Sequence, residues 1–281
     1  MNPKLRLHLS AERAFGLESI RKPSGAPSEV TQELPPARPE PAAQLRAPSL
    51  PRATPVIHTE QPLEQELPLP NFSSPFTSAV LATGKKKSRL QTLDETQVRG
   101  CPKCRLCKTR TQTVFGEGDV DAELMFIGEG PGENEDLTGR PFVGRAGQLL
   151  DKMIAAMGLQ REQVYIANIV KCRPPDNRAP MPDETAACTP YLMDQIETIR
   201  PKVIVTLGLP ATRFILQKDL SMGKMRGQFH DWRGLQVMPT YHPSYVLRSY
   251  TPQTRAAVWS DLQQVMTLLK LKGANKKSDA P

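Results

Sequence analysis

The sequence contains no uninterrupted run of about 18 apolar residues, the length that a helix needs to cross the hydrocarbon core of a membrane. It also lacks the apolar centre of a secretory signal, because charged residues interrupt every apolar stretch of the N-terminal segment "MNPKLRLHLSAERAFGLESIRKP". We therefore expect no membrane span, no secretory leader and a cytoplasmic location.

Cysteine is scarce as well, and the five cysteines are an odd number. Such a set is unsuited to a disulfide framework, whereas a C-x2-C pair in a reducing compartment is typical of metal ligation. Cys101 and Cys104 form such a pair, Cys172 and Cys188 follow after a long gap, and Cys107 is left over. Four thiolates at this spacing suit an iron-sulfur cluster as well as zinc. The alternative is that Cys188 is a core thiol and only the close pair binds metal.

The first 90 residues have few of the branched and aromatic side chains that build a core. They contain 14 of the 28 prolines. Burying their few apolar side chains cannot offset the conformational entropy that the segment would lose on ordering. We predict that residues 1–90 are a disordered Pro-rich tail, with a short helix within residues 4–20 that binds a protein partner. The basic run at 84–89 is interpreted as the solvated end of this tail. Residues 273–281 are predicted to be a disordered C-terminus, which leaves 91–272 for one folded domain.

Acidic residues are outnumbered by basic ones. The 37 Lys and Arg against 29 Asp and Glu give a net charge of +8 and a pI near 9.3. This excess favours a polyanionic partner, because Lys and Arg gain affinity when they release counterions from phosphates. A protein with a merely basic surface has the same composition, so the charge alone does not decide between the two.

Apolar runs alternate with helical periodicity in the second half of the chain, which predicts a mostly parallel sheet with helices on both faces. In such α/β folds, ligands bind at the carboxyl ends of the strands. The segments that follow the strands should therefore line one crevice. The predicted strands are 122–129, 164–170, 202–208 and 235–243, and the predicted helices are 145–159, 183–200, 209–216 and 252–270.

Residues 128–147, "GEGPGENEDLTGRPFVGRAG", follow the first of these strands. They match neither the G-x-G-x-x-G fingerprint of dinucleotide-binding folds nor a P-loop. Their four carboxylates would also repel a phosphate group. We therefore favour a backbone loop that lies close against a flat, neutral ligand, over a phosphate cradle.

This stretch and the segments "ANIVKCRPPDNRAP", "CTPYL" and "PTYHPSYVLR" resemble the signature segments of the family 4 uracil-DNA glycosylases, the iron-sulfur branch of their superfamily. The resemblance runs from about Cys101 to the closing helix, in the same order and with compatible spacing. It implies an α/β fold, in detail a three-layer αβα sandwich on a four-stranded parallel sheet. It also implies a structural 4Fe-4S cluster, whose ligands would be Cys101, Cys104, Cys172 and Cys188.

By the same resemblance, the chain would hydrolyse the N-glycosidic bond of deoxyuridine in single- or double-stranded DNA and leave an abasic site for base excision repair. Phe142 matches the residue that stacks on the flipped uracil, and Asn168 matches the amide that reads uracil against cytosine. His242 matches the donor to uracil O2, where negative charge develops as the bond breaks. We expect a monomer that works at the nucleoid of a bacterial-type cell.

Two further sets of residues are assigned, one for handling water and one for binding DNA. Gly130 stands where other branches of the superfamily place an Asp or Asn, so Glu129 and Glu135 are the candidates for handling water. We also give Glu135 a share in closing the pocket near uracil C5. The segment after His242 is expected to form a loop that wedges into the duplex and contacts phosphate. The DNA-binding candidates are Tyr245, Leu247, Arg248 and Arg145.

Two competing interpretations remain open at this point. One is a superfamily variant that binds uracil tightly or covalently through an inserted basic loop, and the uninterrupted run "RPFVGRAGQLL" argues against it. The other is a non-enzymatic iron-sulfur module that binds nucleic acid, and the complete set of Phe142, Asn168 and His242 argues against that.

Overall fold

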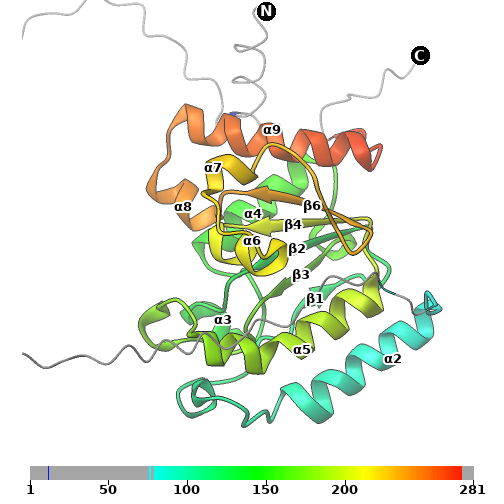
Figure 1. The fold of residues 1–281 in the computed structure, drawn as a ribbon, viewed down its shortest axis with the longest axis vertical. Helices are drawn as coiled ribbons and strands as arrows, with labels where there is room; N and C mark the ends of the chain where they lie inside the picture. The colour runs from blue at the N-terminus through cyan, green and yellow to red at the C-terminus, as the bar shows by residue number, and fades with distance from the viewer. Residues whose placement is uncertain (1–11, 13–75, 77–78, 274–281) are drawn as a thin grey trace, which may run out of the picture. The chain divides into compact units, whose positions relative to one another are not determined.

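The structure, a computed structural model, describes Glu12, Phe76 and residues 79–273 (Figure 1). The chain divides into two units, and all of these residues belong to the unit made of Met1–Ser19 and Leu67–Pro281. The predicted helix within residues 4–20, most of the Pro-rich tail and the C-terminus after Gly273 lie outside the described residues. Among the described residues, no helix combines the length and the apolar character needed to cross a membrane.

Each of the four predicted strands and four predicted helices is present within a few residues of its predicted bounds. The helices are α2 (Thr83–Leu93), α3 (Glu133–Thr138), α4 (Arg145–Ala156), α5 (Pro182–Ile199), α6 (Leu209–Leu216), α7 (Met222–Met225), α8 (Pro243–Arg248) and α9 (Pro252–Leu268). The strands are β1 (Glu117–Gly118), β2 (Leu124–Gly128), β3 (Tyr165–Asn168), β4 (Val203–Leu207), β5 (His230–Trp232) and β6 (Leu235–Thr240). Short 3-10 turns lie at Arg105–Lys108, Arg161–Gln163 and Pro175–Asn177, and a π turn at Asp94–Val98 continues α2.

The sheet has six strands in the order β1-β3-β2-β4-β6-β5, so the prediction of four strands was wrong in number. The four predicted strands are the inner ones, and they pair in parallel. The two additional strands pair antiparallel at the edges, β1 with β3 and β5 with β6. They were missed because Glu117–Gly118 and the mostly polar His230–Trp232 are too short to show a periodic pattern.

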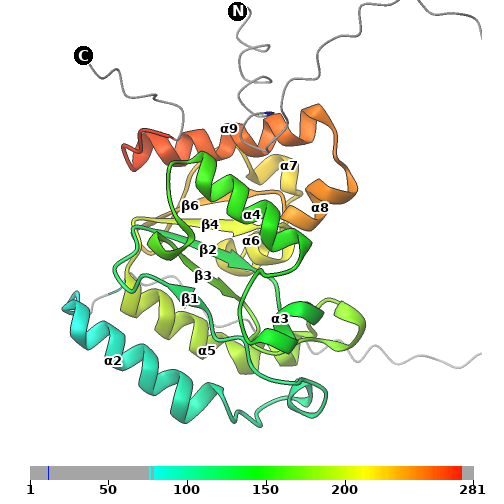
Figure 2. The same cartoon turned by 180° about the vertical axis from the view of Figure 1, so that it is seen from behind.

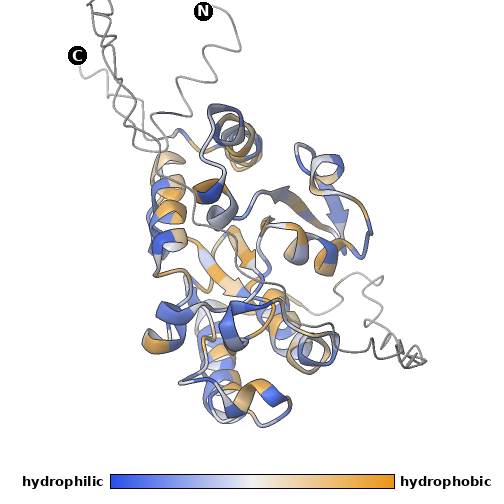
Figure 3. Ribbon diagram, turned by 90° about the vertical axis from the view of Figure 1, so that its left-hand side faces the viewer, coloured by the Kyte–Doolittle hydropathy of each residue, from blue (hydrophilic) through white to orange (hydrophobic). Residues whose placement is uncertain are grey.

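Helices cover both faces of this sheet, because successive strand residues point to opposite sides. In β2, Met125 and Ile127 join the core beneath α2, α5 and α6, while Leu124 and Phe126 join the core beneath α4, α8 and α9. Figure 2 shows α4 on the face turned away from the viewer of Figure 1, and Figure 3 shows hydrophobic residues on the strands at the centre of the domain and on parts of the helices around them. The inner strands are therefore apolar on both sides, as their unbroken apolar runs predicted.

Helix α2 is the main departure from the predicted organisation. The basic run at 84–89 lies inside it, and the helix begins at Thr83, before the predicted domain start at 91. Lys86, Leu90 and Leu93 are buried at helical spacing against the domain. The Lys86 ammonium donates to the Ile199 carbonyl at 3.0 Å and pairs with Asp121 at 2.8 Å. In a sequence, a lysine whose stem is packed and whose charge is paired cannot be told from a solvated lysine. The basic run therefore did not predict this helix.

Phe76 lies against the domain at the end of the sheet where the parallel strands begin. Its ring meets Trp232 edge-on with centroids 5.9 Å apart. The guanidinium carbons of Arg200 and Arg233 lie 4.5 and 3.9 Å from the Phe76 ring centroid. Trp232 pairs with Leu235, the first residue of β6, and Arg200 precedes β4. Aromatic and cation-π contacts therefore hold the chain at this end of the sheet before α2 starts.

Candidate active site at the carboxyl ends of the strands

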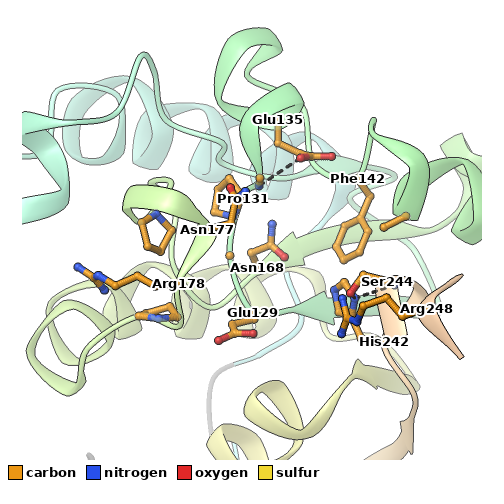
Figure 4. Close-up of a pocket in the computed structure, with 15 residues that line it drawn as sticks. Glu129, Pro131, Glu135, Phe142, Asn168, Asn177, Arg178, His242, Ser244 and Arg248 are labelled. Atoms are coloured by element: carbon orange, nitrogen blue, oxygen red, sulfur yellow. Dashed lines mark hydrogen bonds between the residues drawn. The ribbon is translucent and has the colours of Figure 1, made fainter. Parts of the chain in front are cut away.

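A cavity of about 350 Å³ opens where β2, β3 and β6 end (Figure 4). The structure brings the predicted base-binding and catalytic residues together in it, since Glu129, Gly130, Glu135, Phe142, Asn168 and His242 all line its wall. A second cavity of about 410 Å³ adjoins it and shares Glu129, His242, Ser244 and Arg248. The expected crevice at the carboxyl ends of the strands is therefore present.

Asn168 is the last residue of β3, and only 2% of it is exposed. Its backbone carbonyl accepts from the Lys171 ammonium at 2.9 Å, and that ammonium also donates to Gln195 Oε1 at 2.6 Å. Burial lowers the pKa of Lys171 to about 8. The side-chain Oδ1 of Asn168 is buried without a hydrogen-bond partner among the described residues. Because an unpaired buried acceptor is costly, this oxygen is prepared for a donor that arrives with a ligand.

Gly128 forms the floor under this amide. It ends β2 and stands in register with Asn168 on the neighbouring strand. A Cβ at Gly128 would lie 2.4 Å from Asn168 Oδ1 and 2.6 Å from Cζ of Phe142. Only a residue without a side chain therefore lets the amide and the phenyl ring lie side by side.

Phe142 lies in the loop before α4 with 6% of its surface exposed. Its φ of 51° is in the left-handed region, which non-glycine residues seldom occupy. The surroundings hold it there, because Arg161 donates to its carbonyl at 3.2 Å and to the Pro141 carbonyl. Gly147 allows the same carbonyl to approach, since a Cβ there would lie 1.8 Å from it. The ring is thus fixed as one wall of the cavity.

His242 faces Phe142 across the cavity, with ring centroids 5.6 Å apart. Its Nδ1 accepts from the Ser244 amide at 3.0 Å and lies 2.7 Å from Ser244 Oγ. This pairing leaves the proton of the neutral ring on Nε2. Burial, aided by the nearby Arg248 charge, lowers the pKa of His242 to about 4. The ring is therefore a neutral hydrogen-bond donor at physiological pH.

Glu135 accepts hydrogen bonds from three backbone amides. Oε1 accepts from Val143 at 2.8 Å and Gly144 at 2.9 Å, and Oε2 accepts from Gly132 at 3.1 Å. The carboxylate thereby ties the start of α3 to the loop that carries Phe142 and to the start of α4. Its two oxygens are engaged in shaping the wall, which leaves little capacity for taking a proton from water.

Replacing Glu135 by glutamine should destabilise the domain by about 2–4 kcal/mol, because the new NH2 group would face a backbone N–H and the charge-assisted bonds would be lost. Thermal unfolding of the two proteins measures this difference. Glu133→Gln on the same helix is the matched control, since its side chain is 67% exposed and should leave the melting temperature nearly unchanged. A Glu135→Gln melting temperature equal to that of the control would contradict this role.

Glu129 differs from Glu135, because none of the described residues donates a hydrogen bond to its carboxylate. It follows β2 directly and lines both adjoining cavities. Burial raises the pKa of its carboxyl above the ordinary glutamate value. A half-buried carboxylate with a raised pKa and free oxygens has the properties of a general base. Gly130 beside it contributes only backbone to the wall.

The sequence reasoning missed several residues of the cavity. Asn177 and Arg178 line it from the loop between β3 and α5, together with Pro174 and Pro180. Arg178 pairs with the buried Glu184 at 2.7 Å, and Asn177 Oδ1 accepts from Arg173 at 2.9 Å. The sequence of this loop has no periodic pattern. Its position beside the cavity could therefore be recognised only once the pairing of the strands was known.

The DNA-binding candidates lie on two helices, and only the segment after His242 had been expected to be a loop. Residues 243–248 form α8, in which Tyr245 and Leu247 are each 40% exposed while Val246 is fully buried. Arg248 is exposed at the end of α8 and lines both cavities. Arg145 is exposed at the first position of α4. The segment expected to be a loop is thus a short helix, because Val246 packs into the core beneath α4 and α9.

Four cysteines line one small cavity on the side of β3 that faces α5. Those four are Cys101, Cys104, Cys172 and Cys188, and Cys107 does not line it. All five are free thiols. Among the described residues, no three His, Cys, Asp or Glu side chains converge closely enough to hold a single metal ion. Four thiols around one shared space are a donor set that could hold zinc or an iron-sulfur cluster.

Comparison with known proteins adds a family relationship to this geometry. The model of the uracil DNA glycosylase superfamily matches residues 115–263. The chain is 47% identical over 189 residues to a type-4 uracil-DNA glycosylase of Thermotoga maritima, which covers 66% of this chain and 98% of that protein. It is 49% identical over 185 residues to a type-4 uracil-DNA glycosylase of Saccharolobus solfataricus, covering 63% and 85%. A type-5 uracil-DNA glycosylase of Pyrobaculum aerophilum is 33% identical over 144 residues, covering 45% and 63%.

Proposed function

The chain belongs to the uracil-DNA glycosylase superfamily and to its type-4 branch, and we propose that it excises uracil from DNA at the cavity described above. The reaction is hydrolysis, in which a water oxygen bonds to C1′ of the deoxyribose while the N1–C1′ bond breaks. The electron pair of that bond leaves with the base. The product is an abasic site, the first intermediate of base excision repair.

Asn168 reads the base. Its unpaired Oδ1 accepts from uracil N3–H, and its NH2 group donates to O4. Cytosine presents an acceptor at N3 and a donor at N4, so both pairings fail with cytosine. The site rejects cytosine because polar groups would remain buried and unpaired. Phe142 supplies the flat surface on which the flipped base stacks.

His242 stabilises the leaving group. Its Nε2–H donates to uracil O2, where negative charge grows as the glycosidic bond breaks. Two bonds from Ser244 to Nδ1 fix this tautomer before the substrate arrives. A donor of this kind contributes about 3 kcal/mol to the transition state.

Glu129 orients the attacking water and takes its proton, since no described residue donates to its carboxylate whereas three backbone amides donate to that of Glu135. Glu135 acts by holding the wall of the cavity in place. The loop that Glu135 shapes closes the pocket near uracil C5. The second cavity receives the sugar and its flanking phosphates, with Arg248 at its rim. Tyr245 and Leu247 fill the space that the flipped base leaves in the duplex.

The pH dependence of excision should distinguish the contribution of Glu129 from that of His242. Glu129 must be ionised, so the rate is present above its raised pKa and falls as the pH drops through it. His242 stays neutral down to a pKa of about 4. Single-turnover rates between pH 4 and 8 should therefore show an acid limb that Glu129→Gln removes. An identical acid limb in Glu129→Gln would remove Glu129 from the reaction.

The four cavity-lining cysteines would hold a 4Fe-4S cluster, which when bound would have a structural role and supply no step of the reaction. These cysteines lie in the segment before β1, in the β3–α5 loop and in α5. Free thiols and an iron-sulfur cluster require a reducing compartment, so we place the enzyme with the chromosome in the cytoplasm. We retain the N-terminal tail as the site of a protein partner. We also retain the expectation that the enzyme works as a monomer.

The observation that carries this function is the buried Oδ1 of Asn168 between Gly128 and Phe142, which has no hydrogen-bond partner in the part of the chain that the structure describes. The test uses end-labelled oligonucleotides with one uracil, thymine or cytosine, single-stranded and paired with guanine. Alkaline cleavage after incubation reports abasic sites. Product is expected from uracil alone. Binding of uracil DNA without any abasic product would instead support the non-enzymatic module, and cleavage at cytosine would contradict the role of Asn168.

A further inference from the structure

Arg110 contacts two of the segments that carry the four cavity-lining cysteines. Its Nη1 donates to Cys172 Sγ at 3.1 Å and to the Cys101 carbonyl at 2.9 Å. The residue follows the short turn at Arg105–Lys108 and lines the same cavity as the cysteines. One guanidinium thus joins cysteine positions that are 71 residues apart in the chain, 172 minus 101.

Two of the other three sulfurs form hydrogen bonds with neutral groups. The Tyr191 hydroxyl lies 3.2 Å from Cys101 Sγ, and the Lys171 backbone amide donates to Cys188 Sγ at 3.2 Å. Among the described residues, Arg110 is the only one whose charged side chain donates to one of these four sulfurs. Charge-assisted bonds are stronger than neutral ones, so the Cys172 sulfur has the strongest donor of the set.

We propose that Arg110 is a positioning residue for the iron-sulfur cluster, which holds the Cys172 thiolate in place and withdraws electron density from it. This inference rests on the cluster assigned under the proposed function. Hydrogen bonds to cluster sulfurs and nearby charge are among the factors that set the reduction potential. A cation that donates to a ligand sulfur stabilises the form with one more electron, and so raises the potential. The same contact slows loss of the cluster, because it keeps Cys172 close to Cys101.

Activity alone would not test this role, because the same segment also reaches the active site. The Thr111 amide donates to both carboxylate oxygens of the buried Asp136, at 3.0 and 2.9 Å. Asp136 lies on α3 next to Glu135, so a disturbance at residue 110 would alter the uracil cavity as well. The readout must therefore belong to the cluster itself.

The experiment compares wild-type protein with Arg110→Met and Arg110→Lys, all purified without oxygen as full chains. The first measurement is the rate at which a chelator bleaches the sulfur-to-iron absorbance. The second is the midpoint potential of the one-electron couple that protein-film voltammetry detects. Arg105→Met is the matched control, because Arg105 lies on the same segment, is 62% exposed and pairs with Asp183 rather than with a sulfur.

We expect Arg110→Met to bleach on the order of 10-fold faster than wild type and to have a lower midpoint potential. Arg110→Lys keeps the charge but not the fork of donors, and it should lie between the two. Arg105→Met should match wild type. Arg110→Met values equal to those of Arg105→Met would overturn the role of Arg110 while leaving the proposed function intact.

Two other outcomes are also decisive. Iron-free wild-type protein would overturn the proposed cluster and this inference together. If Arg110→Met takes up no iron, Arg110→Lys is compared with Arg105→Lys: faster bleaching and a lower potential in Arg110→Lys support the inference, and equal values overturn it.

Discussion

Asn168→Ala should slow single-turnover excision of uracil by about 1,000-fold, the largest effect that we expect from one side chain. The substitution removes the acceptor for N3–H and the donor to O4 from a site where only 2% of the residue is exposed. Without them, two polar groups of the bound base are buried unpaired, and losses of this kind add up to about 4 kcal/mol. The measurement is the rate of abasic-site formation at saturating enzyme.

The matched control for this prediction is Asn134→Ala, which deletes an exposed amide from α3 at the edge of the same wall. Its excision rate should stay within about twofold of wild type, as is usual for surface substitutions. Both variants should melt close to wild type, because Oδ1 of Asn168 has no partner to lose within the described part of the chain. An Asn168→Ala rate near that of Asn134→Ala would show that another group reads the base.

Gly128→Ala should slow excision by about 100-fold or more, although it adds a single methyl group. The new Cβ would lie 2.4 Å from Asn168 Oδ1 and 2.6 Å from the Phe142 ring, so both must move. The ring cannot retreat easily, because Arg161 and Gly147 fix the backbone of Phe142. A displacement of about 1 Å at a reacting site is enough for this loss of rate.

Gly223→Ala is the control for this second prediction, since a Cβ there meets nothing within 4 Å. It should leave both the excision rate and the melting temperature near wild type. Crystallography or NMR of Gly128→Ala should show the amide or the phenyl ring displaced. Wild-type excision by Gly128→Ala would mean that the cavity is wider in solution than its walls indicate.

The inner sheet and its principal helices were predictable because their patterns are local. Residues 203–207 are fully apolar but for one threonine, and 209–216 start after a glycine that stops the strand. The edge strands were not predictable, since β1 and β5 owe their conformation to pairing with β3 and β6. Helix α2 was concealed for a related reason, because its buried positions include a lysine that is satisfied by residues far away in the chain.

The candidate site shows the same division. Phe142, Asn168 and His242 could be named because they stand in segments that resemble the signature segments of the family. The sequence could not distinguish Glu129 from Glu135, because both are acidic residues of the same Gly-rich stretch, residues 128–147. Their difference lies in the amides of Gly132, Val143 and Gly144, which fold back onto only one of them.

The position of Phe76 has a practical consequence for anyone who wishes to attach something to this enzyme. Its contacts with Trp232, Arg200 and Arg233 fix the chain at the edge where the parallel strands begin. The uracil cavity lies at the opposite edge, where those strands end. A fluorophore, surface linker or fused domain joined just upstream of Phe76 would therefore start at the end of the sheet that is opposite to the bound DNA.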